Sequence, residues 1–211
     1  MSKETPDKYQ RTLDGKTYFS QAGQDLFVLA MLQRKSHGVY CEIGGAHPIE
    51  SNNTFLLEHT FGWQGVSIEF DRSLVDIYNQ TRKNRCLCAD ATTLDYATLF
   101  REQRFQPQVD YLSVDIEPAE NTYTALCQIP FDSYRFSVIT YEHDFHLSGA
   151  EYMNRSRQFL TERGYQLVVR NVLSFGRDFE DWWVDPLSID ESIWRPFCSA
   201  HIDFSEVFRG Q

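Results

Sequence analysis

The sequence predicts an α/β fold, a doubly wound and mostly parallel sheet with a C-terminal antiparallel hairpin. The first observation is that short apolar runs end in an acid at four places along the chain: Glu42, Glu69, Asp90 and Asp115. Successive runs lie more than about 20 residues apart, the length that a strand and a crossover helix require. The second observation is a pair of apolar segments, residues 165–172 and 175–183, that are close enough in sequence to form a hairpin.

Helices are expected between and after the strands, over residues 24–33, 54–60, 72–84, 95–103, 120–128 and 151–163. Asn52 or Asn53 would cap the second of these helices. Pro118 suits the start of the fifth, because the N–H that proline lacks has no helical partner there. Gly164 would close the last one. A fifth strand at residues 138–141 completes the parallel part of the sheet.

The polar residues 1–16 are expected to be frayed or loosely docked, so we assign residues 1–19 to an N-terminal extension and residues 20–211 to a single domain. The net charge of −10 argues against a nucleic-acid partner, because such proteins neutralise phosphates with basic clusters. The densest basic run, residues 82–85, is interpreted as a solvated helix end. No apolar run reaches the ~20 residues that span a membrane. Five cysteines without a signal peptide indicate the cytoplasm.

The turn after the first strand carries the strongest functional signal. Residues 39–43 form an apolar strand that leads into Gly44, Gly45 and Ala46. Glycines let the backbone approach a ligand closely, and the acid after the second strand can accept the hydroxyls of a ribose. The turn lacks the G-x-G-x-x-G spacing that cradles a pyrophosphate, and Pro48 would disturb such a helix start. Taken alone, Gly-Gly is also typical of an ordinary turn; together with the other strand ends it favours S-adenosylmethionine.

The chain resembles the FkbM-type family of S-adenosylmethionine-dependent methyltransferases. The resemblance runs from about residue 20 to residue 144 and includes Ser20–Asp25, Glu42–Ala46, Ser51–Thr54, Gly62–Gly65, Asp115–Glu117 and Tyr141–His143. Two positions depart from the family pattern. Pro118 stands where a glycine usually follows the D-x-E triplet, and His47-Pro48 stands where Asp-Gly or Asn-Gly is commoner.

This resemblance implies a Rossmann-like methyltransferase fold and a set of cofactor contacts. Glu69 would hold the ribose hydroxyls, Phe70 would cover the adenine, and Asp90 would accept from its amino group beside Ala91. Gly44, Gly45 and Ala46 would form the close backbone approach. Glu42 and Asp115 would face the methionine end, and Gln21 and Gln24 would either cap the cofactor or start a helix.

Five titratable residues follow the fourth and fifth strands: Asp115, Glu117, Glu142, His143 and Asp144. One interpretation makes His143 or Asp115 the general base that takes the acceptor's proton. Another has Asp115, Glu142 and His143 bind a divalent ion such as Mg²⁺, which would lower the pKa of a substrate hydroxyl. In a third, Glu142 or Asp144 only accepts backbone hydrogen bonds.

Residues 179–186 combine Trp182 and Trp183 with three acids, a mixture that suits stacking on a sugar ring or, alternatively, one core tryptophan and one subunit contact. The resulting hypothesis is an O-methyltransferase that acts on a hydroxyl of a small molecule, with a sugar or glycosylated metabolite as the acceptor. The alternatives are a non-catalytic binding module with the same fold and an NAD-dependent oxidoreductase. The sequence leaves the formation of a homo-oligomer open.

Overall fold

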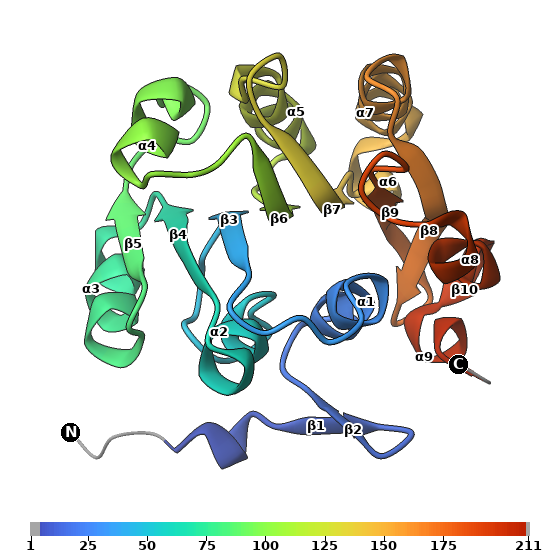
Figure 1. Ribbon diagram of the computed structural model, residues 1–211, viewed down its shortest axis with the longest axis horizontal. Helices are drawn as coiled ribbons and strands as arrows, with labels where there is room; N and C mark the ends of the chain where they lie inside the picture. Colours follow the sequence, from blue (N-terminus) through green and yellow to red (C-terminus); the bar gives the residue numbers. More distant parts are fainter. Residues whose placement is uncertain (1–4, 210–211) are drawn as a thin grey trace.

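The computed structural model describes residues 5–209, and its centre is a sheet of eight strands in the order β10-β8-β9-β7-β6-β3-β4-β5 (Figure 1). The strands are β3 (Val39–Ile43), β4 (Gln64–Glu69), β5 (Arg85–Cys88), β6 (Gln108–Val114), β7 (Arg135–Glu142), β8 (Gln166–Ser174), β9 (Arg177–Val184) and β10 (Ser199–Asp203). Five neighbouring strands, from β5 to β7, pair in parallel. Their carboxyl ends therefore meet at one edge of the sheet.

The hairpin predicted at the end of the domain is present as β8 and β9. Strand β9 runs antiparallel to both β8 and β7, with Glu142 opposite Glu180. Strand β10, which the sequence analysis did not predict, adds to the far side of β8 in parallel. The predicted fold class, a mostly parallel α/β sheet with a late antiparallel hairpin, is confirmed.

Helices cover both faces of the sheet, as Figure 1 shows. They are α1 (Gln24–Met31), α2 (Phe55–Phe61), α3 (Arg72–Thr81), α4 (Tyr96–Glu102), α5 (Ala119–Gln128), α6 (Phe145–Ser148), α7 (Ala150–Glu162), α8 (Glu191–Trp194) and α9 (Phe204–Val207). Pro118 precedes α5 as predicted, and Gly164 follows α7 in the left-handed conformation that ends helices. Thr54, rather than Asn52 or Asn53, occupies the position before α2.

Both tryptophans of β9 belong to the core, which confirms the expectation of one core tryptophan and corrects the expectations of sugar stacking and of a subunit contact. Adjacent residues of a strand point to opposite faces, so Trp182 and Trp183 enter the two separate apolar clusters on either side of the sheet. Neither ring is more than 1% exposed. Trp182 packs against Phe27 of α1, with 4.7 Å between ring centroids. The acids beside them are also buried, and Arg157 forms two hydrogen bonds to Asp181.

The N-terminal segment is attached to the domain, in contrast to the loose docking expected for residues 1–16. The strands β1 (Arg11–Leu13) and β2 (Lys16–Tyr18) form a hairpin after a short 3₁₀ turn, η1 (Pro6–Lys8). The guanidinium of Arg11 donates to the backbone oxygens of Ser20 and Gln21 and to Ser51 Oγ. Residues 1–4 lie outside the described residues. Between residues 5 and 209, no helix has the length and apolar character needed to cross a membrane.

Candidate functional site

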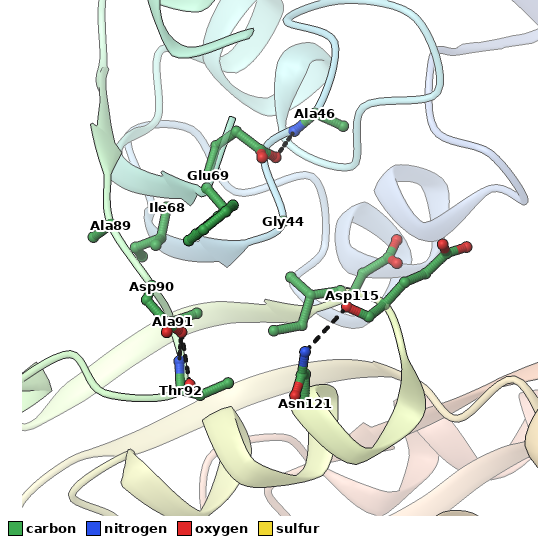
Figure 2. A pocket seen from close by; sticks show the side chains of 13 residues that line it. Gly44, Ala46, Ile68, Glu69, Ala89, Asp90, Ala91, Thr92, Asp115 and Asn121 are labelled. Atoms are coloured by element: carbon green, nitrogen blue, oxygen red, sulfur yellow. Dashed lines mark hydrogen bonds between the residues drawn. The ribbon is translucent and has the colours of Figure 1, made fainter. Parts of the chain in front are cut away.

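A cavity of about 630 Å³ opens at the carboxyl ends of β3, β4, β5 and β6. Figure 2 shows Glu69, Asp90 and Asp115 around it, each from the end of a different strand. This first cavity is lined by Gly44, Ala46, Ile68, Glu69, Phe70, Ala89, Asp90, Ala91, Thr92, Asp115, Ile116, Glu117 and Asn121. Seven of the residues predicted to hold a cofactor therefore lie together: Gly44, Ala46, Glu69, Phe70, Asp90, Ala91 and Asp115.

Gly44 lets the turn after β3 pack against the backbone at the end of β6, because no other residue fits its position. Its φ of +94° lies in the region that favours glycine, and a Cβ atom there would lie 1.7 Å from the backbone oxygen of Asp115. The N–H groups of Gly44 and Gly45 both donate to the backbone oxygen of Ile68. The turn is thus clamped between β4 and β6. Gly45 itself is buried and lines the second cavity described below.

The carboxylate of Glu69 is held in place by the backbone on both sides. Its Oε2 accepts from the N–H of Ala46 at 3.0 Å (Figure 2). Its Oε1 accepts from the N–H of Asp71 at 2.8 Å. Each carboxylate oxygen can accept more than one hydrogen bond, so acceptor capacity remains for a ligand. The side chain is only partly buried and borders the first cavity. This fixed acid at the tip of the second parallel strand suits a pair of neighbouring hydroxyls.

An acid and an aromatic ring also line the first cavity. Asp90 Oδ1 accepts from both the hydroxyl and the N–H of Thr92, and these hydrogen bonds lower the pKa of Asp90. Asp90 is therefore ionised at neutral pH. Phe70 lines the same cavity with 76% of its surface exposed, although it is a large apolar residue. An exposed ring beside a cavity is well placed to cover a flat ligand.

A second cavity of about 590 Å³ adjoins the first, and the two share Gly44, Ala46, Asp115 and Glu117. Its remaining lining residues come from α1's N-terminal side, the loop after β3, the end of β7, α6 and β9: Gln21, Gly45, His47, Glu50, Ser51, Asn52, Asn53, Glu142, Asp144, His146, Leu147 and Arg177. Gln21 thus borders the second cavity. Gln24 is fully buried and bonds to the N–H of Ala22 and to Glu180, which is a structural role.

Asp115 stands at the junction of the two cavities. Burial raises the pKa of this carboxyl group to about 7, and the charges of Asp144, Glu42 and Glu117 act in the same direction. Asp144, on the wall of the second cavity, is also buried, and burial raises its pKa too, against the opposing effect of His146 and His143. An acid that titrates near neutral pH can take a proton from a substrate.

The structure places Glu42 away from both cavities, which corrects the expectation that it faces the methionine end of the cofactor. Its side chain is buried beneath the turn and accepts from Thr54 Oγ1, Ser67 Oγ and the hydroxyl of Tyr78. Burial raises the pKa of Glu42, while the charge of Arg82 opposes this rise. Glu42 therefore supports the turn from the interior of the domain and does not line either cavity.

Arg82 supports the site but is not identified from the sequence, where the run 82–85 has the pattern of a solvated helix end. Its side chain is 1% exposed and pairs with Glu58 of α2 at 2.9 Å. The same guanidinium donates to the backbone oxygen of Pro48 and to Asn52 Oδ1, which fixes the loop that lines the second cavity. A signal for this role was absent, because an arginine at the end of an amphipathic helix is usually solvated.

His47, one of the two departures from the family pattern, organises the start of that loop. Its Nδ1 accepts from the N–H groups of Ile49 and Glu50, at 3.2 and 2.8 Å. Pro48 follows and presents its oxygen to Arg82. The altered residues therefore shape the wall of the second cavity.

His143 is fully buried and borders neither cavity, which corrects the expectation that it faces an acceptor. Its Nδ1 accepts from the N–H of Phe145, and its Nε2 lies 3.5 Å from Asp181 Oδ1. The expected Mg²⁺ set of Asp115, Glu142 and His143 is likewise not assembled, since no three potential metal-ligating acids, histidines or cysteines cluster within residues 5–209. Glu142, the last residue of β7, borders the second cavity, whereas the next residue, His143, is fully buried.

A family model described as the Methyltransferase FkbM domain matches residues 50–167, more than half of the 211-residue chain. The chain belongs to the FkbM methyltransferase family. The match starts after the Gly44-Gly45 turn, includes Asp115 and Glu142, and ends in β8. The predicted resemblance is therefore confirmed. No functionally curated protein matches this FkbM-family chain.

Solved structures share the fold of this FkbM-family protein at low sequence identity. An O-methyltransferase from Bacillus cereus in complex with SAH has a TM-score of 0.54 and 15% identity, over 77% of this chain and 80% of that chain. A putative rRNA methylase from Clostridium thermocellum has a TM-score of 0.53 and 10% identity, over 81% and 97%. A TehB-like SAM-dependent methyltransferase from Corynebacterium glutamicum has a TM-score of 0.50 and 11% identity, over 78% and 88%. At these identities the likeness concerns the fold alone.

Proposed function

We propose that this protein is an S-adenosylmethionine-dependent O-methyltransferase that acts on a hydroxyl group of a small molecule, with a sugar or glycosylated metabolite as the acceptor. The observation that carries the proposal is the position of Asp115, an acid with a pKa of about 7 between two adjoining cavities. One cavity would hold the cofactor and the other the acceptor. Asp115 borders both, as a base between donor and acceptor must.

The first cavity fits the cofactor by the chemistry of its lining. Glu69 would accept the ribose hydroxyls, Phe70 would cover the adenine, and Asp90 would accept from the adenine amino group. Gly44 lets the turn after β3 pack closely on the backbone of Asp115, which no larger residue would allow. The cofactor supplies an activated methyl group when bound, so the protein has to provide alignment and a proton acceptor.

The residues of the second cavity would bind and deprotonate the acceptor. Asp115 is proposed as the base, because it is the carboxyl group shared by both cavities whose pKa lies near the working pH. Asp144 and Glu142 border the second cavity only and would accept hydrogen bonds from neighbouring hydroxyls.

Replacement of Glu69 by alanine should abolish detectable binding of S-adenosylhomocysteine, measured by calorimetry. The expected reason is that the two ribose hydroxyls lose an acceptor that the backbone holds in place. Glu50→Ala is the matched control, because Glu50 is a carboxylate that borders the second cavity only. It should bind the demethylated cofactor like the wild type. Wild-type protein that binds neither S-adenosylmethionine nor its product would refute the proposed function.

Turnover should rise with pH through the titration of Asp115. A base acts in its ionised form, so activity is low below the pKa of about 7 and levels off above it. The positive charge of bound S-adenosylmethionine in the first cavity would favour the ionised carboxylate of Asp115. The inflection of kcat should therefore lie at a lower pH than the inflection of kcat/KM for the cofactor, which reports the free protein. A kcat that stays flat between about pH 5 and pH 9 would contradict Asp115 as the base.

The non-catalytic alternative is decided by turnover. Cofactor binding without methyl transfer to a broad panel of hydroxylated metabolites would favour it, whereas competition by NAD would favour the oxidoreductase.

A further inference from the structure

Exposed apolar side chains gather beside the second cavity. Within residues 5–209, six large apolar residues are exposed, and three of them are in α6 or the β8–β9 turn: Phe145 at 37%, Leu147 at 69% and Phe175 at 95%. Single exposed apolar residues are ordinary on protein surfaces. Exposed large apolar residues next to a cavity are more informative, because exposed apolar surface of this kind can mark a binding site. We call Phe145, Leu147 and Phe175 the apolar rim.

The apolar rim reaches the second cavity at Leu147. Leu147 borders the cavity directly, as does Arg177, which is two residues after Phe175. Helix α6 packs against β9, where His146 Nδ1 lies 3.3 Å from the backbone oxygen of Asp178. The turn between β8 and β9 lies at the same sheet edge as the end of β7, because β8 and β7 both run antiparallel to β9 (Figure 1).

The interior of the second cavity has the opposite chemistry. Its lining includes five carboxyl groups: Glu50, Asp115, Glu117, Glu142 and Asp144. Carboxylates accept hydrogen bonds, so this interior suits a group rich in hydroxyl donors. The cavity's volume of about 590 Å³ lies within the range of sites that hold drug-sized ligands, which leaves room for more than one sugar ring.

We infer that the acceptor is amphiphilic, with a hydroxylated head inside the second cavity and an apolar body that lies over the apolar rim. This inference rests on the proposed function and names its acceptor class. A purely polar metabolite would leave Leu147 and Phe175 in water and gain nothing from them. An apolar body of the acceptor removes that surface from water, and each buried methylene adds to the affinity.

A homologous series of methyl, butyl and hexyl β-D-glucopyranosides tests the inference. Each glucoside is titrated, below its micelle concentration, against protein saturated with S-adenosylhomocysteine, and its affinity is measured by ligand-observed NMR. We expect each added methylene to tighten binding by up to about fourfold, the ratio that corresponds to about 0.8 kcal/mol per buried CH₂. Free butanol and hexanol, which lack the hydroxylated head, should bind much more weakly.

Phe175→Ser should flatten this dependence on chain length and leave the affinity for the methyl glucoside unchanged, because Phe175 borders neither cavity. Leu147→Ser should flatten the dependence on chain length as well. Leu187→Ser is the matched control, because Leu187 is 83% exposed and borders neither cavity. It should behave like the wild type. All three positions are largely solvated, so the variants should fold.

Equal affinities along the series, or no binding by any member, would overturn the inference. Binding to neutral phosphatidylcholine vesicles that depends on Leu147 and Phe175 would assign the apolar rim to a membrane surface and overturn it as well. Failure of the proposed function would be seen separately, as wild-type protein that does not bind S-adenosylhomocysteine before any glucoside is added.

Discussion

Asp115→Asn is expected to lower turnover by roughly 10²–10⁴, the usual effect of removing a general base. The substitution keeps the size of the side chain but removes its ability to take a proton. Affinity for S-adenosylhomocysteine should change by less than about tenfold, because Glu69 at the other side of the first cavity is untouched. The measurement is kcat under saturating cofactor, beside calorimetry of the demethylated product.

Glu117→Gln provides the matched control for this experiment. Glu117 borders both cavities, as Asp115 does, but it is exposed to solvent. The variant should retain most of the turnover. If Asp115→Asn loses turnover and cofactor affinity together, Asp115 is a cofactor ligand and not the base. If it keeps its turnover, the proton goes elsewhere, and Asp144 is the next carboxyl group in the second cavity.

His143→Ala distinguishes two roles of this histidine: the general base that the sequence suggests, and the structural role that its burial indicates. Because His143 contacts Asp181 and the N–H of Phe145 in the interior, its loss should lower stability. The folded fraction should keep its turnover to within about tenfold, since the ring borders neither cavity.

The fold could be predicted because its signals are local. Each apolar run that ends in an acid became a strand of the parallel sheet, and the last two runs became β8 and β9. The exceptions are elements held by distant contacts. The β1–β2 hairpin depends on Arg11, whose partners include Ser51 on a loop 40 residues away. Strand β10 is short and mostly polar, and it owes its place to the free edge of β8.

The candidate site was predictable to the extent that strand ends determine it. Glu69, Asp90 and Asp115 are strand-tip acids, and they border one cavity. Sequence alone does not reveal the direction of a side chain that sits one residue before or after the tip. Glu42 precedes the turn and points into the interior, where it meets Tyr78. The same uncertainty of one residue separates the cavity-lining Glu142 from the buried His143.

Arg82 shows most clearly how burial changes the meaning of a residue. From sequence it ends an amphipathic helix, but in the structure it is a buried cation between three elements. It donates to Glu58 of α2, to the hydroxyl of Tyr40 in β3, and to the loop at Pro48. Guanidinium remains charged in proteins, so its acceptors are arranged around a permanent positive charge. The packing of α2, β3 and the loop at Pro48 against one another therefore depends on Arg82.

Arg82→Met is expected to lower the free energy of unfolding by about 3–5 kcal/mol, because it leaves Glu58 buried without its cation. For a chain of this size, such a loss corresponds to a fall in Tm of roughly 6–20 °C, which thermal unfolding measures. Arg85→Met is the matched control: Arg85 belongs to the same basic run but is exposed, so its effect should stay within about 0.5 kcal/mol. Arg82→Met combined with Glu58→Gln should lose less than the sum of the single changes, since the second substitution removes the unpaired charge. Equal stability of the Arg82 and Arg85 variants would show that the buried pair contributes nothing to the fold.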